Sequence, residues 1–186
     1  MLLAGSDDEA VVRDVSGPDW EQDRLALLDR SLAMSQLLIR RGLRLRSDLL
    51  RPWAHWTTPV FEPRRYDTWF FVAALPSGQL ARDVGGEADL TRWIGLDELL
   101  AGERQGRYPM YPPTQATVAD VVVAVRDSRT AAEGIVAAMA TPRHVRRVVP
   151  WLARDGEGRA VMLIDLDGRG GGQPGPESLT GAGVLP

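Results

Sequence analysis

The chain has 186 residues, 25 acidic side chains and 22 basic ones, all of them arginine, for a formal net charge of −3. This length suits one ordinary domain, or a domain with a tail. The lack of cysteine and lysine excludes disulfides, thiolate metal sites, cysteine nucleophiles, Schiff-base chemistry and a P-loop lysine. The net negative charge argues against a nucleic-acid partner. With no long apolar run and no basic leader in MLLAGSDDE, we expect a cytoplasmic protein without a membrane partner.

The first strong periodicity predicts one helix over residues 19–41. Asp19 and Gln22 have the spacing of a capping box, and Gly42 stands where a helix commonly ends. The apolar face that this helix would bury consists of Leu25, Leu28, Leu32 and Ile39.

Aromatic residues concentrate in the next part of the chain, since ten of the twelve lie between Trp53 and Tyr111. They fall in runs typical of half-buried strands. We expect strands at WAHW, DTWFFVAAL and ADLTRWI, a loop at TTPVFEPRR, a turn at SGQ and a short helix at GLDELLAG.

Proline then marks the start of a further helix, because PMYPPT is stiff and Thr114 or Thr117 could cap a helix beginning at that point. Such a helix start could attract an anion, or could simply need its cap. A second helix, TAAEGIVAAMA, should end before Pro142. RHVRRVVPWLA and AVMLIDL, joined by DGEG, predict a hairpin. From residue 167 onward seven glycines occur in twenty residues, which predicts a disordered tail.

Few side chains carry an obvious chemistry. His55 and His144 each lie beside apolar residues, so packing is the favoured role for both. Asp165 and Asp167 alternate at the end of a strand and could hold a metal, although a solvated strand end is the simpler interpretation. The glycines of GRGGGQPG precede no helix and indicate flexibility rather than a phosphate loop.

EPRRYDTWFF is the most unusual local sequence. Arg64 and Arg65 stand beside Tyr66 at the mouth of an apolar strand. Guanidinium groups match the oxygens of phosphate or carboxylate, so the pair suits an anionic ligand with a flat or apolar portion. The alternative is that Asp67 pairs with one arginine at the rim of the sheet. Glu87 could reach a metal or a water, or be a solvent-facing edge residue.

Four segments in series, WAHWTTP, PRRYDTWFFVAALP, GGEADLTRWIGLDELLAG and MYPPT, resemble the later part of the Nudix hydrolases. The resemblance covers about residues 20–165 and is strongest to the branch of the peroxisomal coenzyme A diphosphatase-like proteins. It implies an α/β/α sandwich around a mixed sheet, incomplete at its N-terminus, over residues 1–166, followed by the tail at 167–186.

The resemblance also implies a function. Nudix hydrolases cleave the diphosphate bond of a nucleoside diphosphate linked to another group, such as a coenzyme A-like or NAD-like molecule, with Mg²⁺ or Mn²⁺. By this resemblance Arg64 and Arg65 would meet phosphate oxygens, and Glu87 would be an auxiliary metal carboxylate. The base or acyl side would be lined by Trp56, Tyr66 and Phe70. A homodimer is a candidate assembly, which the residues alone do not determine.

The sequence departs from this family at its catalytic motif. The Nudix box, G-x5-E-x7-R-E-U-x-E-E-x-G-U with U apolar, does not occur in the chain. In the related branch the box runs into an LLA segment, and this chain begins MLLAG, so we expect the box to lie upstream of Met1 and the chain by itself to be inactive. The alternative function is a non-catalytic module that binds a nucleotide or a protein partner.

Overall fold

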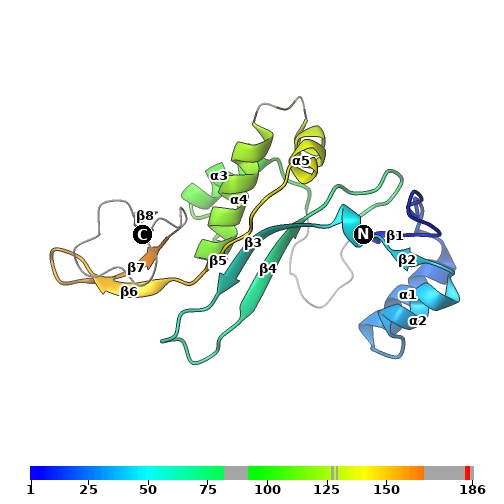
Figure 1. The fold of residues 1–186 in the computed structure, drawn as a ribbon, viewed down its shortest axis with the longest axis horizontal. Helices are drawn as coiled ribbons and strands as arrows, with labels where there is room; N and C mark the ends of the chain where they lie inside the picture. The colour runs from blue at the N-terminus through cyan, green and yellow to red at the C-terminus, as the bar shows by residue number, and fades with distance from the viewer. Residues whose placement is uncertain (82–91, 127, 129, 166–182, 185–186) are drawn as a thin grey trace. The chain divides into compact units, whose positions relative to one another are not determined.

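The computed structural model describes residues 1–81, 92–126, 128, 130–165 and 183–184 (Figure 1). The chain divides into two compact units, Met1–Arg51 with Ala73–Gly95 and Pro52–Val72 with Leu96–Pro186. In these described residues the protein is mixed α/β, with five α-helices and three small sheets. Within the same residues, none of the helices is long and apolar enough to cross a membrane.

The first unit contains a two-stranded sheet and a pair of helices, and the two strands lie before and after the helices in the sequence. Strand β1 (Ala4–Gly5) pairs antiparallel with β2 (Arg44–Leu45), and a short 3₁₀ helix, Ser47–Leu49, comes after β2. Helices α1 (Pro18–Leu28) and α2 (Met34–Arg40) lie between the two strands in sequence.

The single helix predicted over residues 19–41 is wrong, because the chain leaves the helix after Leu28. The Asp29 carboxylate accepts the backbone N–H of Ser31 at 2.8 Å, a local bond that competes with helix continuation. Arg30 then takes a left-handed conformation with φ 64°. The predicted capping box is also wrong, since Gly17 is the N-cap residue and no side chain caps α1.

Ion pairs connect helices α1 and α2, whereas the apolar face predicted from the sequence contributes little to their packing. Asp23 is buried and pairs with Arg40 and Arg41 of the second helix region. Leu25 and Ile39 are 55% and 80% exposed in the described structure, so the predicted face is not a core. The buried apolar residue of α2 is Leu37.

Two glycine predictions in this unit are confirmed. Gly42 follows α2 with φ 62°, the left-handed position that ends many helices. Gly78 has φ 88° in the predicted SGQ turn, which positions the buried amide of Gln79. That amide accepts from the Leu2 N–H at 2.8 Å and donates to the Val12 carbonyl at 2.6 Å, so it joins the turn to the N-terminal segment.

The second unit is built around strand β3 (Arg51–Thr57), which lies between β4 (Asp67–Val72) and β5 (Arg147–Val148). The predicted strand WAHW and the loop after it are confirmed. The predicted strand DTWFFVAAL is confirmed as far as Val72, whereas residues 73–75 are not a strand. Since only a short loop, residues 58–66, joins β3 to β4, the two form an antiparallel hairpin. β5 pairs parallel with β3, with Arg147 opposite His55.

Three helices pack side by side in this unit: α3 (Leu96–Arg104), α4 (Pro112–Val125) and α5 (Ala131–Ala140) (Figure 1). All three were expected. The predicted threonine cap of α4 is wrong, because Tyr111 is its N-cap residue and the Thr117 hydroxyl donates to the carbonyl of Pro113. In α5, Thr130 does cap the helix, accepting the N–H of Glu133 at 3.1 Å.

The terminal hairpin consists of β6 (Trp151–Arg154) and β7 (Ala160–Ile164), antiparallel across the predicted DGEG turn. The prediction is wrong for residues 147–148, which join β3 as strand β5 because Pro150 separates them from β6. The dipeptide Gly183–Val184 forms β8 beside β7. Most of the expected disordered tail, and residues 88–91 of the expected strand ADLTRWI, lie outside the described residues. Residues 92–94 are not a strand.

Candidate functional site

A cavity of about 700 Å³ in the second unit lies against the β3–β4 hairpin. We call it the Arg64 cavity. Its other walls come from the start of α4 and from Pro150 and Met162. Four residues that the sequence singled out line it together: Trp56, Arg64, Tyr66 and Phe70.

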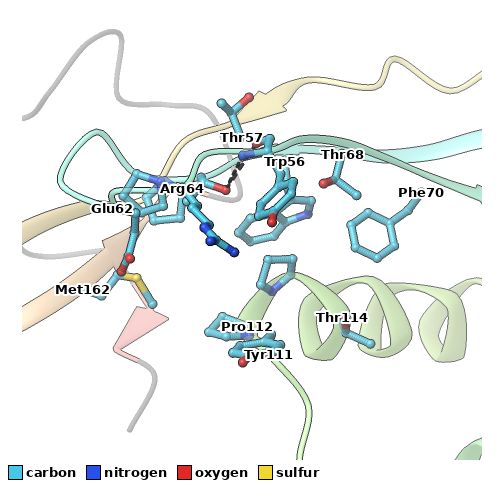
Figure 2. Close-up of a pocket in the computed structure, with 15 residues that line it drawn as sticks. Trp56, Thr57, Glu62, Arg64, Thr68, Phe70, Tyr111, Pro112, Thr114 and Met162 are labelled. Atoms are coloured by element: carbon cyan, nitrogen blue, oxygen red, sulfur yellow. Dashed lines mark hydrogen bonds between the residues drawn. The ribbon is translucent and has the colours of Figure 1, made fainter. Parts of the chain in front are cut away.

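Strand alternation explains which aromatic side chains face the cavity. Successive residues of a strand point to opposite sides of the sheet, so Thr68 and Phe70 face one side while Trp69 and Phe71 face the other. Figure 2 shows Trp56, Thr68 and Phe70 directed toward the start of α4. Trp56 is only 4% exposed and is one of the residues that line the cavity, to which it contributes apolar surface.

Arg64 is the only cation among the residues that line the cavity. Its guanidinium extends from the hairpin loop toward the cavity (Figure 2). Within the part of the chain that the structure describes, this side chain makes no hydrogen bond or ion pair. Glu62 is the single carboxylate of the lining. The cavity therefore combines an aromatic wall with one guanidinium and one carboxylate, beside the hydroxyls of threonine and tyrosine side chains.

The start of α4 offers the cavity no backbone N–H group, although the hydroxyls of Tyr111 and Thr114 belong to residues of the lining. Pro112 and Pro113 carry no N–H group. The next two amides, of Thr114 and Gln115, already donate to the Tyr111 carbonyl at 2.9 and 3.0 Å. The sequence left two interpretations of this helix start, an anion site or a start that only needs its cap, and the structure supports capping by the backbone. The charge that would hold an anion in the cavity would therefore come from Arg64.

The structure separates the two neighbouring arginines. Arg65 does not line the cavity, and its Nε donates to the backbone carbonyl of Thr58 at 3.1 Å. Glu87, the expected auxiliary carboxylate, lies outside the described residues.

On the opposite face of the hairpin, polar groups gather around Asp67. Its Oδ1 accepts from the Thr57 hydroxyl at 2.6 Å and lies 2.8 Å from His55 Nε2. The His55 ring stacks on Trp69, with centroids 4.1 Å apart. The alternative, in which Asp67 pairs with one of the two loop arginines, is wrong, because the guanidinium that approaches it is that of Arg147, whose Nε lies 4.0 Å from Oδ1.

These contacts change the acidity of the carboxyl group. The hydroxyl of Thr57, then the ring of His55, hold the pKa of Asp67 below its usual value, and the charge of Arg147 acts in the same direction. Sequence reasoning treated His55 as a packing residue and missed its bond to Asp67. The available signal was the spacing of His55 and Thr57, which share one face of β3.

The described residues do not fit the Mg²⁺ or Mn²⁺ ion that the family resemblance implies. Mg²⁺ takes about six oxygen ligands, usually with at least one or two carboxylates. The described structure contains no group of three or more histidine, aspartate or glutamate side chains that could hold an ion. Glu62 alone cannot supply such a site.

Comparison with protein-family models, with curated proteins and with solved structures gives no match to this chain.

Proposed function

We propose that the Arg64 cavity binds a nucleotide-type small molecule, with its phosphate at Arg64 and its flat or apolar part against the aromatic wall. The observation that carries the proposal is the position of one guanidinium, without a protein partner in the described structure, in the same cavity lining as Trp56 and Phe70. A cavity volume of about 700 Å³ suits a small molecule of the size of a nucleotide.

The resemblance to Nudix hydrolases supports the same ligand class. Under this proposal the chain corresponds to the later part of such a diphosphatase, folded as part of an α/β/α sandwich. The Nudix box does not occur in the sequence, and the described carboxylates do not form a metal site. We therefore assign ligand binding, and not diphosphate cleavage, to this chain by itself.

Binding is tested by calorimetric titration of the purified chain with ADP, ADP-ribose, NADH and coenzyme A. Phe70 and Phe71 form a matched pair, because they are adjacent in sequence but only Phe70 lines the cavity. Loss of one base-stacking side chain costs about 1–3 kcal/mol of binding, so Phe70→Ala should weaken binding about tenfold and Phe71→Ala should leave it unchanged. Equal effects of the two substitutions would contradict the assignment.

Activity is tested separately. The chain incubated with Mg²⁺ and any of these ligands should release no more product than a protein-free blank. Metal-dependent turnover would overturn the view that this chain binds without hydrolysing. Failure of every ligand to bind would overturn the ligand class itself.

A further inference from the structure

The loop between β3 and β4 carries two opposite charges that line the Arg64 cavity, those of Glu62 and Arg64. At the base of the loop, the Thr58 N–H donates to the Tyr66 carbonyl and the Tyr66 N–H donates to the Thr58 hydroxyl, each at 2.9 Å. Nearer its tip, the N–H of Glu62 donates to the Pro59 carbonyl at 3.2 Å. Both charged side chains therefore extend from a loop with a hydrogen-bonded backbone.

Glu62 and Arg64 do not neutralise each other. Within the part of the chain that the structure describes, neither side chain makes a hydrogen bond or an ion pair, so the two charged groups are beyond ion-pair distance. Figure 2 shows their charged ends directed apart, with that of Glu62 toward Met162. Because two residues of chain span at most about 7 Å, one small ligand can nevertheless contact both groups.

The charge that a ligand meets in this cavity depends on what Arg64 binds. Under the proposed function, on which this inference rests, Arg64 holds a phosphate. The Glu62 carboxylate would then lie beside a negative ligand without a counter-ion, because Arg64 is the only cation among the described residues of the lining. An unpaired charge is costly once a ligand displaces water from it. A purely anionic ligand therefore fits this lining poorly.

A positive group on the ligand would balance the Glu62 carboxylate. A carboxylate can only accept hydrogen bonds, so a hydroxyl or an ammonium group could face it. The bond from an ammonium group is charge-assisted and roughly twice as strong as a neutral one, and it also supplies the missing positive charge. Pro59 and Met162 in the same lining offer apolar surface for a short carbon chain. An amino alcohol esterified to the phosphate combines these features.

We propose that the Arg64 cavity binds a nucleoside diphosphate esterified to an amino alcohol, whose ammonium group donates to the Glu62 carboxylate. Arg64 binds phosphate oxygens of the same ligand, so each charge of the loop meets an opposite charge. The proposed function leaves open which group lies beyond the phosphate, and Glu62 is the residue that selects it.

The test compares CDP-ethanolamine with CDP-glucose by calorimetric titration of the full chain at low ionic strength. The two ligands share the nucleoside diphosphate, but the first carries an ammonium group and the second only hydroxyl donors. We expect CDP-ethanolamine to bind at least about tenfold more tightly, and a smaller difference would overturn this inference alone. Absence of binding by both ligands and by ADP would overturn the proposed function and this inference with it. Free phosphoethanolamine should bind more weakly than CDP-ethanolamine, and equal binding would contradict the nucleotide part of the proposed function.

Two variants test the position of the ammonium group. Glu62→Gln keeps the shape of the side chain without its charge and should reduce the preference for CDP-ethanolamine over CDP-glucose to within about twofold. Glu157→Gln is the matched control, since it removes the same charge from a side chain that is 72% exposed and does not line the cavity, and it should keep the preference. A larger preference in Glu62→Gln, or an equal loss in Glu157→Gln, would refute the assignment to Glu62. The comparison of the two ligands in the unmodified chain needs no variant, so it tests the proposal even if a substitution disturbs folding.

Discussion

Replacing Asp23 with asparagine should loosen helices α1 and α2. The Asp23 side chain is 8% exposed and lies between Arg40 and Arg41, with a 2.8 Å bond from Arg41 Nε. The substitution keeps the shape of the side chain but removes its charge. Because α1 ends at Leu28, these ion pairs connect two separate helices rather than two turns of one helix.

The magnitude depends on the exposure of each partner. Removing one member of a fully buried ion pair costs about 3–5 kcal/mol. Here the Arg40 and Arg41 side chains are 55% and 25% exposed, so water solvates both guanidinium groups once the carboxylate charge is lost. Asparagine also retains one acceptor oxygen. We therefore expect a loss of about 2 kcal/mol, or roughly a 30-fold change in an equilibrium constant.

Hydrogen–deuterium exchange of the amides of α1 and α2 measures this change locally. Exchange in Asp23→Asn should be about 30-fold faster than in the unmodified chain. Glu21→Gln on the same helix is the control, since Glu21 forms a partly exposed i,i+3 pair with Arg24 at 2.7 Å, and such a pair is worth about 0.5 kcal/mol at most. If the two variants exchanged within about threefold of each other, the Asp23 ion pairs would not hold the helices together.

Three further predictions concern single positions. A Cβ on Gly134 would lie 2.6 Å from that of Val125, so Gly134→Ala should lower the free energy of unfolding by about 1–3 kcal/mol and with it the melting temperature. A Cβ on Gly156 would lie in open space, so Gly156→Ala, the control, should cause no such fall in the melting temperature. Arg30→Gly should raise stability by about 0.5 kcal/mol in urea unfolding, because φ there is 64° and relief of left-handed strain exceeds the added chain entropy. The pKa of Asp67 is lower in the folded chain than the ordinary carboxyl pKa. Ionised Asp67 therefore stabilises the fold at a pH above the ordinary pKa, and this stabilisation is lost as the pH falls through the lower pKa of the folded chain. Asp67→Asn should therefore flatten the acid limb of the stability curve, and an unchanged acid limb would contradict the bonds to Thr57 and His55.

Local patterns in the sequence predicted the elements that depend on local chemistry. The aromatic runs identified β3 and β4, and strand alternation then brought Trp56 and Phe70 to one face. Gly42 and Pro142 correctly marked helix ends. These predictions succeed because periodicity, backbone conformation and missing donors act within a few residues.

Other features depend on contacts that the sequence does not display. The parallel pairing of Arg147 with His55 joins residues that are distant in the chain. Arg64 and Arg65 lie in a loop, where no periodicity distinguishes the side chain that enters the cavity from the one that bonds to Thr58. The break after Leu28 had a local signal in Asp29–Arg30–Ser31, but the apolar periodicity on both sides of it outweighed that signal.

Equilibrium binding of ADP to Arg64→Ala and Arg65→Ala tests the central claim most directly. The two arginines are adjacent and equally charged, but only Arg64 lines the cavity. A hydrogen bond to a charged group contributes about 1.5–3 kcal/mol, so Arg64→Ala should raise the Kd for ADP at least about tenfold. Arg65→Ala should leave it within about twofold. Equal losses in both variants, or unchanged binding in Arg64→Ala, would contradict an Arg64 cavity that holds the phosphate.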